Sequence, residues 1–170
     1  MKKSGFTLVE LLVVVMIISV LTSIDLPQYR RAMDRSKAAE AMQMLPPLFE
    51  ARERWVIENQ CSWSNGQIQD CNDNASLTAQ KLDIESGGST SGTTITTKYF
   101  TYKLIDGKPT NKNQACVSAT PQWGANRGLT AATIWYRGDK FSCNGSEQGC
   151  DILNVITKKA DGTMSYEGCI

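Results

Sequence analysis

Residues 1–26 decide the architecture of this chain, and they read MKKSGFTLVELLVVVMIISVLTSIDL. A short basic and polar segment precedes a run from Phe6 to Leu26 that is almost wholly apolar. About 20 residues of α-helix cross the hydrocarbon layer of a bilayer, so this run is long enough to be a transmembrane helix. It is long for a cleavable secretory signal, and no small-x-small cleavage site follows it. The simplest interpretation is a helical membrane anchor.

One charged residue is unusual for a plain anchor. Glu10 lies near the start of the apolar run, where a carboxylate is costly unless it is paired or functional. Asp25 is less unusual because it lies at the far end of the run, near the expected interface. The position of Glu10 therefore indicates a specific role for its charge.

The residues around Glu10 resemble the type III signal of type IV prepilins and of the related type II secretion pseudopilins. The signal is a basic leader ending in Gly5, then Phe6, then Glu10, then an uninterrupted apolar helix. In that family a membrane prepilin peptidase cuts after the glycine on the cytoplasmic side and N-methylates the new terminal residue. The resemblance implies that Gly5–Phe6 is the processing site and that Phe6 is the mature N-terminus.

The resemblance also implies an assembly role for Glu10. Cleavage leaves a positive amine on Phe6 inside a low-dielectric layer. A buried amine and a buried carboxylate are each unfavourable alone and much less so together. Glu10 of an incoming subunit would pair with the Phe6 amine of its neighbour and so fix the axial register. The alternative is that Glu10 pairs with the amine of its own chain, one helical turn away.

The helical pattern continues from Gln28 to Asn59, a segment rich in good helix formers. A stripe at mostly three- and four-residue steps is expected to pack on the head: Ala32, Ala39, Met42, Leu45, Phe49 and Val56. The opposite face carries Arg31, Asp34, Arg35 and Arg52. Glu50 and Glu58 each lie four residues from Arg54, a spacing that supports a helix modestly.

Three prolines interrupt this helix, and each is expected to kink it, because an interior proline removes a backbone hydrogen bond. Pro27 ends the membrane stretch, and Pro46 and Pro47 lie further along. At the proline pair two alternatives stay open: a sharper break, or a helix that ends at Leu45 and restarts.

The remaining residues, about 120 in number, suit one compact head domain. Ser, Asn, Gln, Gly and Thr dominate residues 62–97, and the low-complexity stretch 86–94 predicts a flexible surface loop. Strand-like runs follow at 99–104, 115–119 and 133–137 and, less regularly, at 152–156, with turns at 106–107 and 138–139.

The predicted fold class is therefore α+β: a long N-terminal helix, transmembrane in its first half, packed on an antiparallel sheet. By the resemblance, the chain divides into a cleaved leader at 1–5, a transmembrane or filament-core helix at 6–27, and a periplasmic or extracellular pilin head at 28–170.

Six cysteines and no histidine favour disulfides in an oxidising compartment over a zinc site. The cysteines are Cys61, Cys71, Cys116, Cys143, Cys150 and Cys169. The short loop between the first two favours their pairing. A resemblance to the disulfide-bounded C-terminal loop of many type IV pilins pairs Cys150 with Cys169, which leaves Cys116 with Cys143.

The sequence offers little catalytic chemistry. There is no histidine, no Gly-rich phosphate loop and no supported carboxylate pair, so neither an enzyme nor a cofactor is predicted. Residues 70–74 carry oxygen ligands without EF-hand spacing and are expected to form a solvated turn, with no metal. The formal net charge is +1, and Arg137, Lys158 and Lys159 are expected to be solvated, so no nucleic-acid partner is predicted.

The resemblance implies a structural subunit of a type IV pilus, polymerised through its N-terminal helix. Its expected partners are other copies of itself or related pilins, prepilin peptidase, the inner-membrane assembly machinery and, before assembly, membrane lipid. Its expected location is the bacterial inner membrane, then an extracellular pilus or a periplasmic pseudopilus. The alternatives are a type II secretion pseudopilin, or a membrane-anchored binding module that never polymerises.

Overall fold

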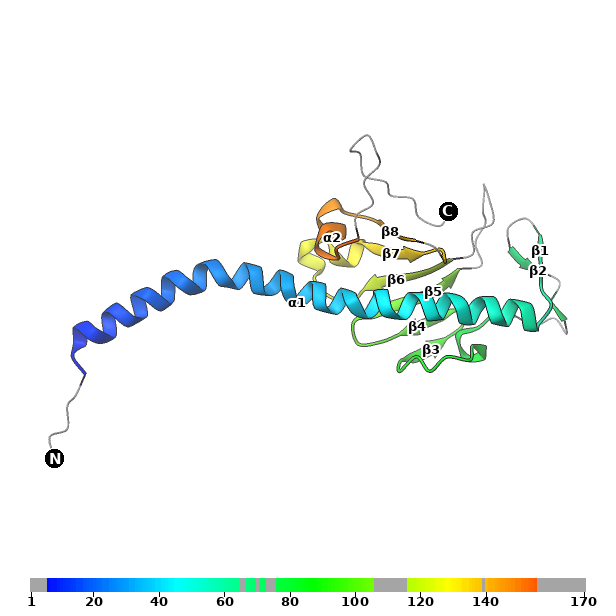
Figure 1. Cartoon of the computed structure of the whole chain (residues 1–170), viewed down its shortest axis with the longest axis horizontal. Coiled ribbons are helices and arrows are strands. Elements are labelled where there is room, and N and C mark those ends of the chain that lie inside the picture. The colour runs from blue at the N-terminus through cyan, green and yellow to red at the C-terminus, as the bar shows by residue number, and fades with distance from the viewer. Residues whose placement is uncertain are drawn as a thin grey trace, which may run out of the picture.

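The structure, a computed structural model, describes residues 6–64, 67–69, 71–72, 76–105, 116–138 and 140–155. Within these ranges the side chains of residues 24, 25, 63, 64, 67, 69, 105, 116 and 147 are not described. One helix, α1 (Leu8–Glu58), runs along a six-stranded sheet and extends far beyond it at its N-terminal end (Figure 1). This arrangement confirms the predicted α+β fold.

The six strands form an antiparallel meander in which spatial order follows chain order. They are β3 (Ser89–Ser91), β4 (Thr94–Thr96), β5 (Phe100–Ile105), β6 (Cys116–Pro121), β7 (Thr133–Tyr136) and β8 (Phe141–Asn144). The long central pair sets the register, with Phe100 opposite Pro121 and Ile105 opposite Cys116.

The remaining elements are short. A separate hairpin, β1 (Ser62–Ser64) and β2 (Gln67–Gln69), follows the end of α1. Three 3₁₀ turns are η2 (Ala79–Lys81), η3 (Ala125–Arg127) and η4 (Leu129–Ala131). Helix α2 (Glu147–Ile152) follows β8 and lies at the same end of the sheet as η3 and η4 (Figure 1).

The core lies between the second half of α1 and the sheet. The fully buried apolar side chains of α1 recur at three- and four-residue steps: Ala38, Ala41, Leu45, Leu48, Ala51 and Trp55. The sheet contributes Ile95, Phe100, Tyr102, Leu104, Val117, Ala119 and Ile134. These two surfaces form one hydrophobic cluster, so the head packs around the second half of α1.

The buried face of α1 differs from the predicted stripe. Leu45 and Val56 are buried as expected, whereas Ala32 and Ala39 are exposed. Asp34 and Arg52, which were assigned to the opposite face, are buried. The prediction was wrong at these positions because it counted only apolar residues. Asp34 finds polar partners in the head, and Arg52 forms an ion pair with the neighbouring Glu53.

Helix α1 continues through all three prolines and does not end at Leu45. Leu45 and Leu48 are both fully buried, so packing on either side of the proline pair holds the helix against the sheet. Its two segments, Leu8–Ser23 and Leu26–Glu58, meet at 43°, next to Pro27. Figure 1 shows this bend in the part of α1 that lies beyond the head.

Within the described ranges, no single helix is long and apolar enough to cross a membrane by itself. The two bent segments of α1 together satisfy that requirement, by length and composition alone.

Three of the four predicted strands are confirmed as β5, β6 and β7, and the fourth is wrong. Residues 147–152 form α2, whose first turn is capped because the Gly149 N–H donates to Ser146 Oγ over 3.1 Å. The loop expected at 86–94 is instead a hairpin, with Gly92 at a φ of 55° between β3 and β4. Strand β8 was not predicted. Gly138 has a φ of 93°, as suits the expected turn, while Asp139 and residues 106–107 are outside the described residues.

The part of the chain that the structure describes contains two disulfides. Cys61–Cys71 ties the end of α1 to the segment after the β1–β2 hairpin, as predicted. Cys143 of β8 bonds Cys150 of α2, so the predicted pairs Cys150–Cys169 and Cys116–Cys143 are wrong. The turn after β8 folds α2 back onto the strand, which brings these two close partners together. Residue 169 and the side chain of Cys116 lie outside the described part of the chain.

Replacing both Cys143 and Cys150 with alanine should lower the free energy of unfolding by about 2–3 kcal/mol, because the crosslink restrains the unfolded chain. Urea unfolding of the purified protein without reductant measures this change. Peptide mapping of the same unreduced sample should recover a Cys143–Cys150 peptide and no free thiol. A Cys150–Cys169 peptide would contradict the assignment.

Candidate functional site

The N-terminal part of α1 exposes an unusually large apolar surface. Between Phe6 and Leu26, every large apolar side chain that the structure describes is between 48% and 85% exposed. Exposed apolar residues follow one another without interruption from Leu11 to Ile18, so the surface covers all sides of the helix. A helix that is apolar all round is stable only when a bilayer or other helices surround it.

The polar side chains of this segment are satisfied within the helix itself. Ser19 Oγ donates to the Val15 carbonyl at 2.6 Å, and Thr22 Oγ1 donates to the Ile18 carbonyl at 2.8 Å. Ser23 Oγ donates to the Val20 carbonyl at 2.7 Å. These hydroxyl groups therefore need no outside partner, which suits the segment to apolar surroundings.

Glu10 closes the first turn of α1. The Glu10 N–H donates to Thr7 Oγ1 over 3.3 Å. In return, the Thr7 N–H and hydroxyl both donate to Glu10 Oε2, each at 2.8 Å. This reciprocal arrangement is a capping box, which supplies partners for groups that a helix start leaves unpaired.

The capping box leaves part of the Glu10 carboxylate available. Both Thr7 contacts use Oε2, and no described residue donates to Oε1. Phe6 is 85% exposed, while Gly5 lies outside the described residues. The sequence analysis missed Thr7, although a Thr followed by Glu three residues later is the sequence signature of such a cap.

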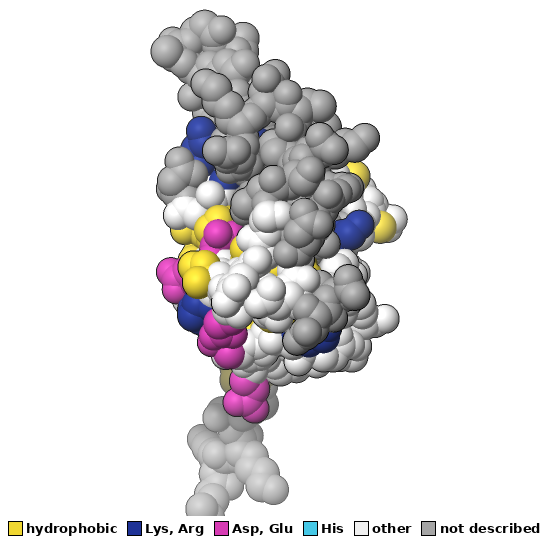
Figure 2. Space-filling model, turned by 90° about the vertical axis from the view of Figure 1, so that its right-hand side faces the viewer, with side chains coloured by type: hydrophobic (Ala, Val, Ile, Leu, Met, Phe, Trp, Pro, Cys, Tyr) yellow, Lys and Arg dark blue, Asp and Glu magenta, His cyan; other side chains and the backbone are white. Residues whose placement is uncertain are grey.

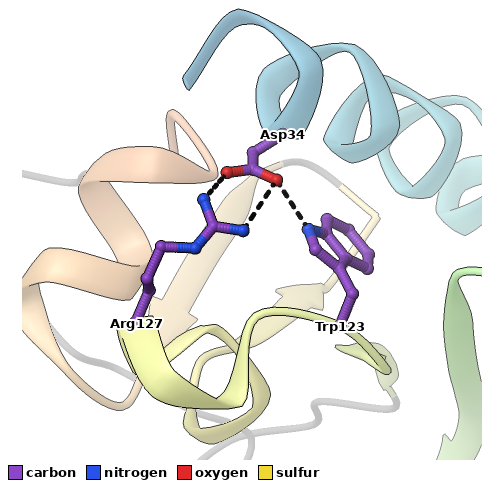
Figure 3. A network of polar contacts seen from close by, with 3 residues as sticks. All are labelled: Asp34, Trp123 and Arg127. Atoms are coloured by element: carbon purple, nitrogen blue, oxygen red, sulfur yellow. Dashed lines mark hydrogen bonds and ion pairs between the residues drawn. The ribbon is translucent and has the colours of Figure 1, made fainter. Parts of the chain in front are cut away.

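A second polar site joins α1 to the head just beyond the apolar segment. Asp34 is buried, and its Oδ1 accepts the indole N–H of Trp123 at 2.8 Å (Figure 3). Arg127 approaches the same carboxylate with both terminal nitrogens: Nη1 forms an ion pair with Oδ2, and Nη2 lies 3.3 Å from Oδ1. We call these three residues the Asp34 cluster.

The connection from β6 to β7 is shaped to deliver the two head residues of the Asp34 cluster. Gly124 and Gly128 flank η3 with φ values of 72° and 70°, a left-handed conformation that favours glycine. A Cβ on Gly124 would also lie 2.3 Å from a methyl carbon of Leu129. The two glycines thus allow the tight turns that bring Trp123 and Arg127 onto α1.

Aromatic contacts support the same junction. The Trp123 ring lies edge-on to Phe100, with centroids 5.0 Å apart. Lys37 Nζ lies 5.2 Å from the ring centroids of both Trp123 and Tyr99. A cation over aromatic faces adds an attraction between α1 and the head. The junction therefore fixes how the head sits on the helix where the apolar segment ends.

Further along α1, Glu40 receives two hydrogen bonds from the sheet side. Thr97 Oγ1 donates to its Oε1 at 2.9 Å, and the Tyr102 hydroxyl donates to the same atom at 3.3 Å. Burial, reinforced by the Glu40 carboxylate, raises the pKa of Tyr102 well above its usual value. Tyr102 therefore stays protonated and remains a donor over the physiological pH range.

Near the end of α1, Arg54 makes an exposed ion pair with Asp83, with contacts of 2.8 and 2.9 Å. This hydrogen-bonded pairing raises the pKa of Arg54 and lowers the pKa of Asp83. Glu50 and Glu58, the neighbours expected from helical spacing, contribute only longer-range attraction. An exposed pair of this kind adds little stability.

The described residues contain no group of three or more His, Cys, Asp or Glu side chains placed to hold a metal ion. Of the predicted turn at 70–74, only Cys71 and Asn72 are described, and Cys71 is in a disulfide. What the site offers is an exposed apolar surface, a carboxylate at its start, and a polar junction at its end.

Asp34→Asn should lower the free energy of unfolding by about 2–3 kcal/mol, because it removes the charge that compensates Arg127 in a largely buried site. Asp83→Asn is the matched control: it breaks the exposed ion pair between the head and Arg54 of the same helix, and it should leave stability almost unchanged. Chemical unfolding of the detergent-solubilised protein measures both. Equal effects of the two substitutions would show that the Asp34 cluster does not anchor the head.

One family model and one known protein match parts of the chain. The family model described as the prokaryotic N-terminal methylation motif matches residues 1–24. The type IV major pilin protein PilA of Myxococcus xanthus (strain DK1622) is 39% identical over 57 residues. This match covers 34% of the chain and 26% of the relative, so the chain spans about a quarter of the protein it resembles. No solved structure matches. The N-terminal part of the chain is therefore similar to prepilin-type methylation motifs and to a type IV major pilin, and the fold is a long helix on an antiparallel sheet.

Proposed function

We propose that this chain is a structural subunit of a type IV pilus, and not an enzyme. In this proposal, prepilin peptidase processes it between Gly5 and Phe6, and it polymerises through its N-terminal helix. One observation carries the proposal: the first half of α1 is apolar on every side and exposed, while the second half is the spine of a folded head. Such a subunit can move from a bilayer to a helical bundle without refolding, because both environments bury the same surface.

The bundle would form from α1 segments of neighbouring copies. Before assembly, the same segments would lie in the bacterial inner membrane. The partners of the chain would be other copies of itself or related pilins, prepilin peptidase and the inner-membrane assembly machinery, with membrane lipid around the anchor. Its final location would be an extracellular pilus.

The geometry of Glu10 supports a role in recruitment. Thr7 occupies Oε2, so Oε1 remains able to accept a hydrogen bond from an amine. Cleavage before Phe6 would create such an amine. An amine and a carboxylate that lose their hydration together stabilise each other, and only one axial offset between neighbouring helices brings them into contact. Glu10 would therefore cap its own helix and set the register to its neighbour.

The main alternative is a type II secretion pseudopilin, which would form a short periplasmic filament from the same kind of subunit. The similarity to a major pilin favours the pilus. A membrane-anchored module that never polymerises is the third candidate. Filaments sheared from the cell surface would support a pilus. Membrane-bound, processed protein with no filament at all would support the anchored module.

Processed protein should begin at Phe6 and carry one added methyl group on its terminal amine. Gly5→Val should abolish cleavage, because a branched side chain at the cut bond crowds the peptidase site. Ser4→Ala, one residue further from that bond, is the control and should be cleaved normally. N-terminal sequencing and intact mass give both readouts, and finding Met1 in assembled filaments would contradict the proposed processing.

Glu10→Ala should lower the yield of sheared filaments by at least about tenfold, because an uncompensated charge in a dry helical bundle costs more than 1.4 kcal/mol. Membrane insertion and cleavage should be unchanged, since neither needs the pair. Glu10→Gln should resemble Glu10→Ala, whereas Glu10→Asp keeps the charge and should be milder.

Thr7→Val separates the two roles of Glu10, because it removes the capping hydroxyl and leaves the carboxylate in place. It should retain most filament yield. Membrane-fraction protein, processed size and sheared filament yield are measured for each variant. A normal filament yield from processed Glu10→Ala protein would show that the carboxylate does not control assembly. If Thr7→Val lowered the filament yield as much as Glu10→Ala, the loss would be due to the helix cap and not to the pairing with the amine.

A further inference from the structure

We propose that the junction between anchor and head carries a binding site for the phosphate group of an anionic membrane lipid. The site is formed by Arg30 and Arg31 of α1 and Arg127 of the head, which we call the basic foot. The inference rests on the proposed function in one respect only: the apolar segment must lie in a bilayer before assembly.

The basic foot lies at the depth of the lipid headgroups when the apolar segment lies in a bilayer. The exposed apolar surface ends at Leu26, and Arg30 and Arg31 are exposed. At 1.5 Å per residue they lie about 6–8 Å beyond Leu26 along the helix, comparable with the thickness of one headgroup layer. Tyr29, next to them, is 64% exposed, as suits an aromatic residue at the interface.

The basic foot lines a cavity of suitable size and mixed character. The cavity has a volume of about 390 Å³. Leu26, Pro27 and Ile152 form its apolar wall, and the three arginines form its cationic wall. A second cavity of about 260 Å³ shares Arg30 and Arg127 with the first. A lipid phosphate would contact the guanidinium groups, and the glycerol and first methylene groups would contact the apolar wall.

The cationic charge of the foot is only partly compensated. Among the described residues, no carboxylate forms an ion pair with Arg30 or Arg31. Asp151, on the cavity wall, is an exposed carboxylate, and Gln148 adds an uncharged amide. The nearest buried carboxylate, Asp34, is already engaged by Trp123 and Arg127. Two unpaired guanidinium groups beside a third therefore remain to bind an anion.

The Asp34 cluster prepares Arg127 for this role. Asp34 holds the guanidinium through Nη1 and Nη2, yet the Arg127 side chain stays 37% exposed. A guanidinium group has five N–H donors, so donors remain for a second anion. Because Asp34 already fixes its orientation, little side-chain entropy is lost when a phosphate binds.

The charges of the head are arranged to bring this end toward an anionic surface. Arg35 and Lys37 follow the foot on α1, whereas Glu50, Glu53 and Glu58 lie toward the opposite end. Figure 2 faces that opposite end and shows Asp and Glu side chains gathered along one side of it. Lys and Arg side chains appear on the same face, so the attraction of an anionic bilayer would act mainly on the foot and would draw that end of the head toward its surface.

The test uses the full chain, inserted into vesicles that contain equal amounts of phosphatidylglycerol and phosphatidylcholine. The protein is released in mild detergent, and its retained lipids are measured by native mass spectrometry. Wild-type protein should retain phosphatidylglycerol in clear preference to phosphatidylcholine. Arg30→Gln with Arg31→Gln should lower that preference by about tenfold or more. Arg127 is left unchanged because it also supports the fold.

Lys103→Gln with Lys140→Gln is the matched control. It removes the same charge from two exposed lysines on β5 and before β8, and it should leave the lipid preference unchanged. A parallel arm adds inorganic phosphate in place of phosphatidylglycerol, and it should give no adduct that depends on Arg30 and Arg31.

Four results would overturn the inference. The first is equal retention of the two lipids by wild-type protein, and the second is an unchanged lipid preference in the Arg30→Gln/Arg31→Gln variant. The third is binding of inorganic phosphate without any lipid preference. The fourth is a protein dimer that replaces the lipid adducts and is lost when the two arginines are substituted. The proposed function is judged separately, from membrane-fraction protein and sheared filament yield. A chain that forms filaments but shows no lipid preference would overturn only this inference.

Discussion

The structure depends on one constraint: a single helix must satisfy two different environments along its length. The first half of α1 is apolar on every side, and the second half buries most of its apolar side chains against the sheet. No part of the described head covers the first half, so the head can fold without hiding the surface that assembly would use. Folding and the proposed association would thus use separate segments of one continuous helix.

That division makes the junction near Asp34 important. The helix bends by 43° next to Pro27, and the Asp34 cluster joins the head to α1 shortly after the bend. Glu40 and Leu45 extend the contact, one through hydrogen bonds and the other through core packing. The bend and the polar contact that fixes the head on α1 therefore lie within about two turns of each other. The polar groups at this point contribute orientation as well as stability.

Much of this could be predicted from sequence, because the strongest signals are local. The apolar helix before Leu26 was predicted from the length and composition of the run alone. The strands β5 and β7 were predicted because they are rich in aromatic and β-branched residues. The hairpin β3–β4 was missed because its Ser, Thr and Gly residues are held by backbone pairing around one buried side chain, Ile95.

The burial of Asp34 could not be predicted, because its partners Trp123 and Arg127 lie 89 and 93 residues away in the sequence. The pairing of Cys143 was missed for a different reason. The C-terminal resemblance directed Cys150 toward Cys169, whereas an unpredicted helix, α2, brings Cys150 back to β8. The cap by Thr7 could have been predicted from local sequence, because Thr7 and Glu10 have the spacing of a capping box. It was missed because Glu10 was considered only as a partner for the Phe6 amine.

The meander has a consequence for how the head folds. Each strand from β3 to β8 pairs with its neighbour in the sequence, and the two disulfides among the described residues join cysteines only 10 and 7 residues apart. Formation of the sheet therefore needs few closures of long loops, although docking of the sheet on α1 joins residues far apart in the sequence. If the head is exported during synthesis while the N-terminus stays on the cytoplasmic side, α1 is in place before any strand emerges. Each strand could then add to the growing edge of the sheet in the order of synthesis, and the two crosslinks could form without waiting for distant parts of the chain.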